Sequence, residues 1–585
     1  MKRILNLILI TAITGAFVFL ASCGDEFLNK QPPGSAAGAV IETPAGVEGI
    51  LIGAYDRITT YDMFGAALAN DWTYGDCASD NAYKGTSYGD QTAFNTVERY
   101  EALPANPYMR NRWRDCYRIV ARANDVLDFY MVVQEGNNPI PEPRASQIEA
   151  EAKFLRAWGH FKATRIFRNI PYIMTVKEMD GVLPEHVPNE TEGWEGIEAD
   201  LQFAIDNLPA TPPLGHVGRP TQYAAMAVKA HAHMYQNELD RARPLLDNII
   251  GSGQFELADN FNDNFSAFHN NNKESIFEIQ IAVTGETDGS TMRCNRATAH
   301  QSGPVSVGWG FYQPSQDLFE AYQVTGDGLP VLDKDDRTAL ANDMGIASSE
   351  EFIPTDHPLD PRVDWTIARR GIDFNGFAIH GGMAWIRSQS NGGPYMTKKY
   401  HYSAEERDAG LFRAPAWGAR NVRKYRLGLV LLWRAEIAVE DNDLNYAREL
   451  VNQVRERAKG SEVVMGRAST YVFDGRPVEV DWDQPAANYS VEPYPADHLA
   501  FANQVNARKA VRLELRLETA TEGHRFFDLR RWGIISEVLN DYIARDSEFR
   551  TFMVGASFNS PRDEYWPLPE AQLDIQDALK QDPNY

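Results

Sequence analysis

The spacing of apolar residues along the chain predicts a mostly α-helical protein. In three stretches, apolar side chains recur every three or four positions, which places them on one face of a helix. These stretches run from Ile119 to Val133, from Ile148 to Phe161 and from Trp194 to Leu208. The last is followed by Pro209, a residue that ends helices. A further helix is expected between residues 43 and 61.

Two later stretches resemble each other and predict paired helices. Residues 239–245 (LDRARPL) are similar to residues 444–450 (LNYAREL), and each follows an alanine-containing helical stretch. The small residues Ala242 and Ala447 fall where the two helices of a pair would pack closely. Such pairs are typical of tetratricopeptide repeats, and the helices around residues 118–168 suggest further divergent units.

Between these two copies, from about residue 256 to residue 425, the helical periodicity is lost. Residues 275–281 alternate as a strand, and the rest of the segment is rich in Gly, Pro and Asp. We interpret it as a loop-rich insertion with minor β structure, because structureless loops of this length are uncommon in compact domains unless they are functional. Residues 70–88 are also predicted to be loops, and a hairpin is predicted around Asp474-Gly475.

The first 22 residues have the pattern of a lipoprotein signal peptide. Lys2 and Arg3 precede an apolar run over residues 4–20, and small residues lead to Cys23. The order Leu20-Ala21-Ser22-Cys23 resembles a bacterial lipobox, in which the cysteine thiol receives a lipid such as palmitate. The alternative is an ordinary signal peptide with an incidental cysteine. We expect lipidation at Cys23.

This pattern divides the chain into a signal peptide, a tether and one body. Residues 23–40 are expected to form a lipid-anchored leader, since they are polar and rich in Pro and Gly apart from one apolar pair. Residues 41–585 are expected to form a single body. Within it, the helical scaffold would occupy about 41–255 and 426–545, with the insertion over about 256–425.

Composition and charge narrow the possible functions. The chain has 585 residues, of which 43% are hydrophobic and 24% charged, as in globular proteins with a core. Its formal net charge of −24 disfavours binding to nucleic acid. No second apolar run approaches the ~20 residues that cross a bilayer. Buried thiols are expected at Cys77, Cys116 and Cys294, whose spacing fits no metal motif. The sequence does not decide whether two of them form a disulfide.

No catalytic signature stands out in the sequence. The chain lacks the GxSxG, HExxH and P-loop motifs, so no catalytic residue is predicted. Asp333, Asp335 and Asp336 lack the spacing of a calcium-binding EF-hand, and no metal or cofactor is predicted. A pair of carboxylates suited to glycoside hydrolysis is defined by distance in space, so this alternative stays open.

Residues 511–533 combine an ambiguous pattern with dense charge. Residues 511–518 alternate apolar and charged side chains, which by period alone predicts a strand, although most are helix formers. They lead into residues 519–533 (TATEGHRFFDLRRWG). We interpret the charges from His524 to Arg531 as an ion-pair network that closes the helical core, with Glu514 and Glu518 as partners. The alternative is an anion-binding site.

Residues 511–533 resemble the signature of the SusD/RagB family, surface lipoproteins that capture nutrients. Trp113 with residues 117–127 is similar to the family's early helix, and residues 151–158 are similar to its second. Residues 565–570 (YWPLPE) and 581–585 (QDPNY) are similar to its closing motifs. The resemblance runs from the lipobox to the last residue and keeps the family's order.

The resemblance implies a mostly α-helical, SusD-like body in which residues 511–520 are helical. It also implies a non-enzymatic lipoprotein that faces outward from the outer membrane. Such a protein binds a glycan and delivers it to a SusC-like TonB-dependent transporter. The alternatives are a peptide ligand, a lipid-anchored glycoside hydrolase, or a scaffold that only contacts other proteins.

Aromatic side chains in the predicted loops are the candidates for ligand contact. A flat ring matches the C–H face of a sugar, while neighbouring Asp, Asn, Gln and Arg side chains bond its hydroxyls. A single loop aromatic is more often a packing residue, so we expect only a minority to touch ligand. The candidates are Trp72, Tyr74, Tyr83, Tyr88, Trp309, Tyr312, Trp385 and Trp417.

Overall fold

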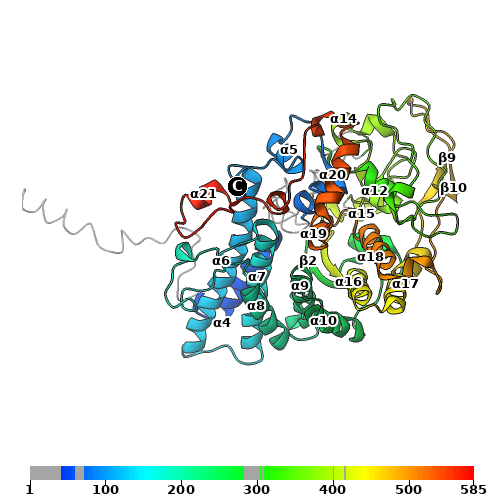
Figure 1. The fold of residues 1–585 in the computed structure, drawn as a ribbon. Helices are drawn as coiled ribbons and strands as arrows, with labels where there is room; N and C mark the ends of the chain where they lie inside the picture. The colour runs from blue at the N-terminus through cyan, green and yellow to red at the C-terminus, as the bar shows by residue number, and fades with distance from the viewer. Residues whose placement is uncertain (1–40, 60–70, 282–302, 305–307, 400, 414–416) are drawn as a thin grey trace, which may run out of the picture.

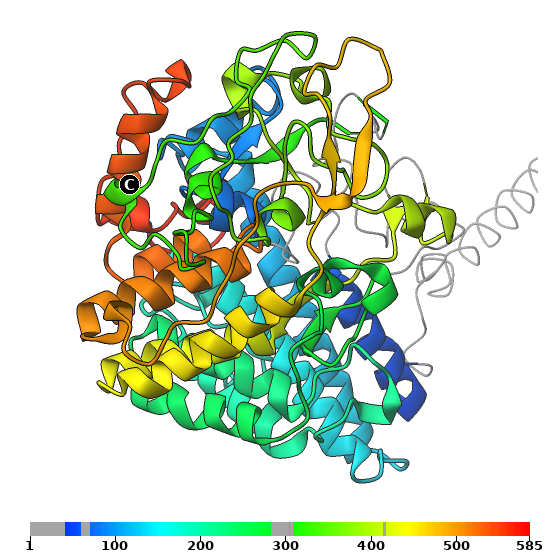
Figure 2. The same ribbon diagram turned by 90° about the vertical axis from the view of Figure 1, so that its right-hand side faces the viewer.

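Long helices build one half of the molecule, and shorter elements with long loops build the other (Figures 1 and 2). The computed structural model describes residues 41–59, 71–281, 303–304, 308–399, 401–413 and 417–585. The expected signal peptide and leader, with Cys23, lie outside the described residues, as does Cys294. No helix of the described part is long and apolar enough to cross a membrane.

The long helices follow one another in space much as they do in sequence. Each packs on the next from α6 to α10, α10 packs on α16, and α16 packs on both α17 and α18. Their bounds are α4 Pro44–Asp56, α6 Pro107–Glu135, α7 Arg144–Phe167, α8 Trp194–Asn207, α9 Gln222–Tyr235, α10 Leu239–Gly251, α16 Leu427–Glu440, α17 Leu444–Gly460, α18 Gln504–Thr519, α19 Arg525–Arg531 and α20 Ile535–Asp546.

Local sequence explains where these helices begin and how closely they cross. The Asn106 side chain accepts a hydrogen bond from the Tyr108 N–H, and Pro107 occupies the first position of α6. In α7, a Cβ on Gly159 would lie 2.9 Å from the Cys116 carbonyl of α6. Glycine at this position therefore allows α6 and α7 to approach closely.

The two similar sequence stretches form two helix pairs that pack on each other. Ala242 of α10 and Ala447 of α17 are fully buried, as expected for small residues at helix crossings. Arg243 pairs with Asp441 at 2.6 Å, which links α10 to the end of α16. The prediction of a mostly helical fold with tetratricopeptide-type pairs is therefore confirmed.

The segment between α10 and α16 begins and ends with strands that pair with each other. Strand β2 (Ser275–Ile279) pairs antiparallel with β8 (Val422–Arg426), so α16 begins where the segment returns to the helices. The predicted strand at 275–281 and the predicted hairpin, formed by β9 (Met465–Ala468) and β10 (Val480–Pro485), are both confirmed. The remaining short elements are α5 Thr92–Glu98, α12 Gln316–Ala321, α13 Val363–Thr366, α14 Gln389–Gly392, α15 Ala404–Asp408, α21 Glu570–Leu573, β1 Ala82–Gly85, β3 Phe311–Pro314, β4 Ile367–Ala368, β5 Met396–Thr397, β6 Phe412–Arg413 and β7 Trp417–Gly418.

Residues 71–85 are not the loops that their lack of helical periodicity predicted. They run through the interior, where residues 73–77 form a helical turn and β1 pairs antiparallel with β3. A Cβ on Gly75 would collide with the backbone of Gly523, and the Gly523 N–H donates to Asp76 at 2.6 Å. Burial raises the pKa of Asp76 to about 6. This segment thus joins the helices to the charged stretch after α18.

The alternating stretch at 511–518 is helical and lies within α18, as the resemblance implied. Its apolar side chains and three of its four charged side chains are buried, so the alternation does not separate a core face from a solvent face. Glu514 pairs with Arg455 at 2.9 Å, and Glu518 pairs with Arg362 at 2.9 Å.

The structural interpretation of the charges after α18 is confirmed, but the predicted partners were wrong. Arg525 pairs with Asp80 at 2.8 Å, and Arg531 pairs with Glu436 of α16. Arg530 donates to two backbone carbonyls. Glu514 and Glu518 face arginines from other segments, because α18 presents them toward α17 and the insertion.

Candidate ligand-binding site

Three of the candidate aromatics lie in the core and expose almost no surface. Trp72 is 1% exposed, and Tyr74 and Tyr312 are fully buried. The Tyr74 hydroxyl donates to the Tyr108 carbonyl, and the Tyr312 hydroxyl donates to Asp76. These three rings therefore pack in the core, which is the role expected for most of the candidates.

Among the other candidates, Tyr88 and Trp309 belong to neighbouring segments, because the Thr86 N–H donates to the Gly310 carbonyl at 2.6 Å. Tyr88 is 59% exposed and meets the ring edge of Phe552 at a centroid distance of 6.0 Å. Trp309 and Trp385 are half-buried, and Gly303 lies against the Trp385 ring. Trp417 lies in β7, and its side chain is outside what the structure describes. Contact of these four with ligand stays a prediction.

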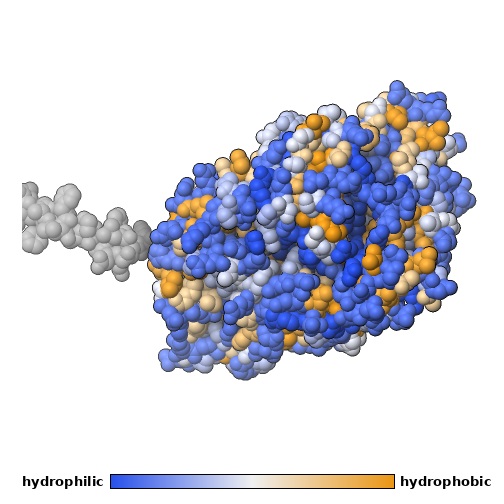
Figure 3. All heavy atoms as spheres, viewed as in Figure 1, coloured by the Kyte–Doolittle hydropathy of each residue, from blue (hydrophilic) through white to orange (hydrophobic). Residues whose placement is uncertain are grey.

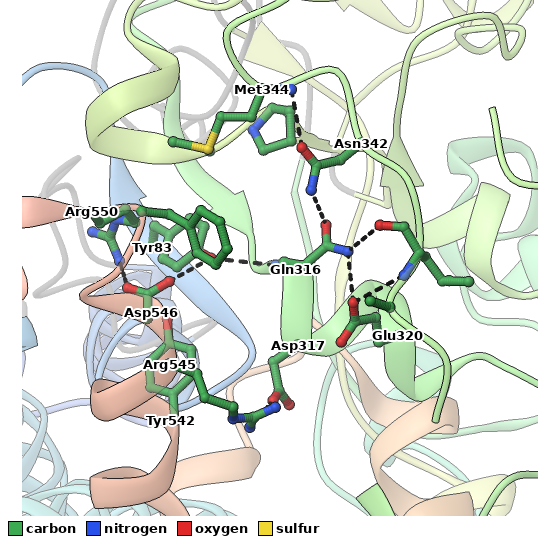
Figure 4. A pocket seen from close by; sticks show the side chains of 15 residues that line it. Tyr83, Gln316, Asp317, Glu320, Asn342, Met344, Tyr542, Arg545, Asp546 and Arg550 are labelled. Atoms are coloured by element: carbon green, nitrogen blue, oxygen red, sulfur yellow. Dashed lines mark hydrogen bonds and ion pairs between the residues drawn. The ribbon is translucent and has the colours of Figure 1, made fainter. Parts of the chain in front are cut away.

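A pocket of about 230 Å³ opens between α12 and α20 and contains the remaining candidate, Tyr83 (Figure 4). Four separate segments build it: β1, α12 with residues 339–344, the turn at 393–394, and the end of α20. Its lining combines aromatic, aliphatic and polar side chains. The lining residues are Tyr83, Gln316, Asp317, Glu320, Ala339, Leu340, Asn342, Met344, Gly393, Pro394, Tyr542, Arg545, Asp546, Phe549 and Arg550.

Aromatic rings and paired charges form one wall of the pocket. The Tyr83 hydroxyl donates to Asp546 at 2.8 Å, and the other oxygen of Asp546 pairs with Arg550 at 2.9 Å. The Arg550 guanidinium also lies 3.8 Å from the centre of the Tyr83 ring. Burial, together with the charge of Asp546, raises the pKa of Tyr83, so its hydroxyl stays protonated. Phe549, at 65% exposed, stands at the rim.

Amide and carboxylate groups form the opposite wall, as Figure 4 shows. The Gln316 side-chain amide donates to Glu320 Oε1 at 2.9 Å and accepts from the Asn342 amide at 3.0 Å. The Leu340 N–H also donates to Glu320 Oε1. These bonds fix the polar groups in place before any ligand arrives.

The surface on the side of the molecule drawn in Figure 3 is mixed in character. In the space-filling view, small apolar patches are scattered among polar residues, and no single apolar face dominates this side of the molecule (Figure 3).

Ion pairs neutralise Asp317, which lies in the first turn of α12. Asp317 pairs with Arg545 at 2.7 Å, with Lys334 at 2.9 Å and with Arg516 at 2.9 Å. Arg545 is still 42% exposed in its side chain. It therefore remains accessible as a hydrogen-bond donor at this side of the pocket.

Sequence reasoning identified only Tyr83 among the pocket residues. Gln316 and Glu320 lie four positions apart on α12, a six-residue helix within a segment predicted to be loop. Phe549 follows a predicted helix, and no sequence pattern indicated that it would contact a ligand. The pocket arises only where four distant segments meet, and spacing along the chain does not encode such a meeting.

Among the described residues, one group of side chains could hold a metal ion: Glu198, His233 and Glu238. Their ligand atoms lie within 4.8 Å of one another. The His233 Nδ1 already bonds Glu238 at 2.8 Å, and Arg241 pairs with both carboxylates. Arg241 thus pairs with both acids, and the group lies where α8, α9 and the start of α10 meet.

Comparison with known proteins gives consistent matches along the chain. Residues 273–585 match the family model described as "SusD family", and residues 26–234 match one described as "Starch-binding associating with outer membrane". SusD-like protein P25 of Formosa agariphila is 24% identical over 584 residues, which cover 96% of each chain. A SusD-like protein of Bacteroides ovatus is 24% identical over 330 residues, which cover 54% of this chain and 57% of that protein.

Solved structures share the fold at low sequence identity. A SusD-like protein from Bacteroides fragilis superposes with a TM-score of 0.68 at 20% identity, over 94% of this chain and 99% of that one. Surface glycan-binding protein A from Bacteroides thetaiotaomicron, in complex with laminarihexaose, superposes with a TM-score of 0.64 at 19% identity, over 93% and 100%. The first family model alone covers more than half of the 585 residues, so this protein belongs to the SusD family.

Proposed function

We propose that this protein is a non-catalytic, glycan-binding member of the SusD family and that the pocket between α12 and α20 contacts the glycan. The observation that carries the proposal is the chemistry of the pocket. The rings of Tyr83 and Tyr542, each 4% exposed, lie across the pocket from fixed amide and carboxylate groups, and Phe549, 65% exposed, offers the most accessible ring. Rings offer flat apolar faces for sugar C–H groups, and the polar groups accept or donate to hydroxyls.

The size of the pocket limits what it holds. Its volume of about 230 Å³ is below the ~300–1,000 Å³ of typical small-molecule sites. One sugar ring at the end or on a branch of a glycan suits such a pocket better than a run of several rings. Surface glycan-binding protein A, which shares the fold, is known in complex with laminarihexaose, and this supports an oligosaccharide ligand here.

Replacement of Phe549 by alanine is expected to weaken glycan binding about tenfold, or about 1.4 kcal/mol, because one ring contact at the rim is lost. Isothermal titration calorimetry would measure this with laminarihexaose, maltohexaose and cellohexaose. Phe549 is 65% exposed, so the change should hardly affect folding. The control is Trp482→Ala, an equally drastic change at a 56% exposed ring in β10, outside the pocket.

Three outcomes would contradict different parts of the proposal. Unchanged affinity of the Phe549 variant, for a glycan that the wild type binds, would remove the pocket from the binding site. Binding of peptides but of no glycan by the wild type would replace glycan capture by peptide capture. Release of shortened products from any glycan would show that the protein is an enzyme.

We further propose that a lipid on Cys23 anchors the protein to the outer membrane, facing outward, and that it hands its glycan to a SusC-like transporter. The lipobox-like residues 20–23 and the outer-membrane description of the matched family support this. Cys23→Ala should move the protein from the membrane fraction to the soluble fraction without changing glycan affinity. A membrane-bound Cys23→Ala protein would refute lipid anchoring at this residue, and absence of the transporter from affinity-purified membrane complexes would refute the partnership.

A further inference from the structure

Glu320 differs from the other acidic residues that line the pocket. Asp317 and Asp546 each pair with cations at 2.9 Å or less. Among the residues that the structure describes, no cation pairs with Glu320. Of the acidic side chains that line the pocket, Glu320 is thus the one that forms no ion pair within the described part of the chain, and the charge of Arg545 acts on it from a longer distance.

The surroundings of Glu320 leave one carboxylate oxygen for a ligand. Gln316 and the Leu340 N–H both donate to Oε1, at 2.9 and 3.2 Å. Within the described part of the chain, Oε2 has no partner and is not enclosed by protein. Burial raises the pKa of Glu320, whereas the hydrogen bonds from Gln316 and the Leu340 N–H favour the ionised carboxylate.

We propose that the pocket accepts an uncharged sugar ring and excludes carboxylated or sulfated rings, and that Glu320 sets this selectivity. The inference rests on the proposed glycan-binding function and names the substrate class of the same site. A sugar hydroxyl can donate to Oε2 in a charge-assisted hydrogen bond, which is stronger than a neutral one. An anionic group in the same place would meet a like charge in a partly desolvated pocket, where repulsion is weakly screened.

The bonds at Oε1 make Glu320 suited to this role. They hold the carboxylate in one orientation, so an approaching anion cannot avoid it by a rotation of the side chain. Arg545 is the accessible cation at this side of the pocket, and it already pairs with Asp317 at 2.7 Å and with Asp541 at 3.1 Å. A ring that carries a negative charge would have to compete with these two carboxylates for Arg545.

The test uses a matched pair of ligands and a matched pair of variants. The neutral probe is whichever of laminarihexaose, maltohexaose and cellohexaose the wild type binds most tightly. The charged probe is the same oligosaccharide oxidised at C6 to uronic acids. We expect the wild type to bind the neutral probe at least about tenfold more tightly than the charged one.

Glu320→Gln should reduce this preference to within about threefold, because the charge is removed while a side-chain oxygen still accepts from Gln316 and Leu340. Affinity for the neutral probe should fall by up to about tenfold, since a neutral acceptor replaces a charged one. The control is Glu548→Gln, which makes the same change of net charge at an exposed residue that does not line the pocket. It should leave the preference unchanged.

Acidity provides a second readout. Lowering the pH to about 4 protonates a carboxyl group whose pKa is raised, so the wild-type preference should decline, while that of Glu320→Gln should stay constant. Equal wild-type affinity for both probes, or a preference that Glu320→Gln leaves intact, would overturn the selectivity and leave glycan binding standing. Failure to bind any neutral or charged glycan would instead overturn the proposed function itself.

Discussion

Replacement of Glu518 by glutamine is expected to lower the free energy of unfolding by about 3–5 kcal/mol. Glu518 is fully buried in α18, where it pairs with Arg362, Arg426 and Arg457. Glutamine has the same shape but no charge, so three buried guanidinium groups would lose a shared counter-charge. Chemical denaturation in urea, followed by far-UV circular dichroism, would measure the loss.

A surface ion pair provides the matched control for Glu518. Glu440 pairs with Arg508 at 2.6 Å, and both side chains are 33% exposed. Glu440→Gln should cost less than about 1 kcal/mol, because water already solvates these charges. Equal losses for the two variants would mean that burial does not decide the strength of these pairs.

Replacement of Asp71 by asparagine should also destabilise the protein by at least about 3–5 kcal/mol. Asp71 is 2% exposed and stands among four buried cations. Arg165 and Lys424 lie 3.4 and 3.9 Å from its carboxylate, and Arg112 and Lys162 lie closer. The backbone φ of 52° at Asp71 suits asparagine equally well, so the change tests charge alone.

A double-mutant cycle would show whether the loss comes from the unbalanced cations. Lys162→Met removes one cation and keeps the length of the side chain. The combined Asp71→Asn/Lys162→Met variant should therefore lose less stability than the two single changes together, by about 0.5–3 kcal/mol. Strict additivity would argue against charge as the cause. Asp125→Asn, in an exposed pair with Arg122, is the control and should be nearly neutral.

Asp71→Asn should also change how the stability of the protein depends on pH. Burial opposes ionisation of Asp71, but the surrounding cations outweigh it and hold its pKa well below the usual range. A lowered pKa in the folded state gives stability that is present above the unfolded pKa of about 3.9 and is lost as the pH falls further. The gap between wild type and Asp71→Asn should therefore be constant near neutrality and shrink below about pH 4.

The composition of residues 71–88 gave a misleading signal for function. Aromatic rings beside Asp and Asn side chains suggested a sugar-binding loop. In the structure, Tyr312 bonds Asp76, and Asn81 does so at 3.1 Å, within the core. The same residue types satisfy each other in a buried segment and bind ligand in an exposed one. Composition does not distinguish these situations, because burial depends on what the rest of the chain places over the segment.

For the charged residues near the C-terminus, the sequence predicted the kind of interaction but not the partners. Dense alternating charge correctly indicated mutual pairing in place of an anion site. The partners were wrong, because Asp80 and Glu436, which pair with Arg525 and Arg531, lie 445 and 95 positions away in sequence. Pairing as a principle follows from the cost of burying charge, whereas the choice of partner follows from the packing of distant helices.

The sequence by itself determined the helical scaffold, the repeated helix pairs, the strand at 275–281 and the family, because these depend on local periodicity and on short motifs. Only the tertiary structure decided which aromatics are buried and which acids stay unpaired. The pocket that contains Tyr83, Glu320 and Phe549 belongs to the second group. Two of its residues that bond each other, Tyr83 and Asp546, lie 463 positions apart, and their meeting depends on how the helices and the insertion pack together.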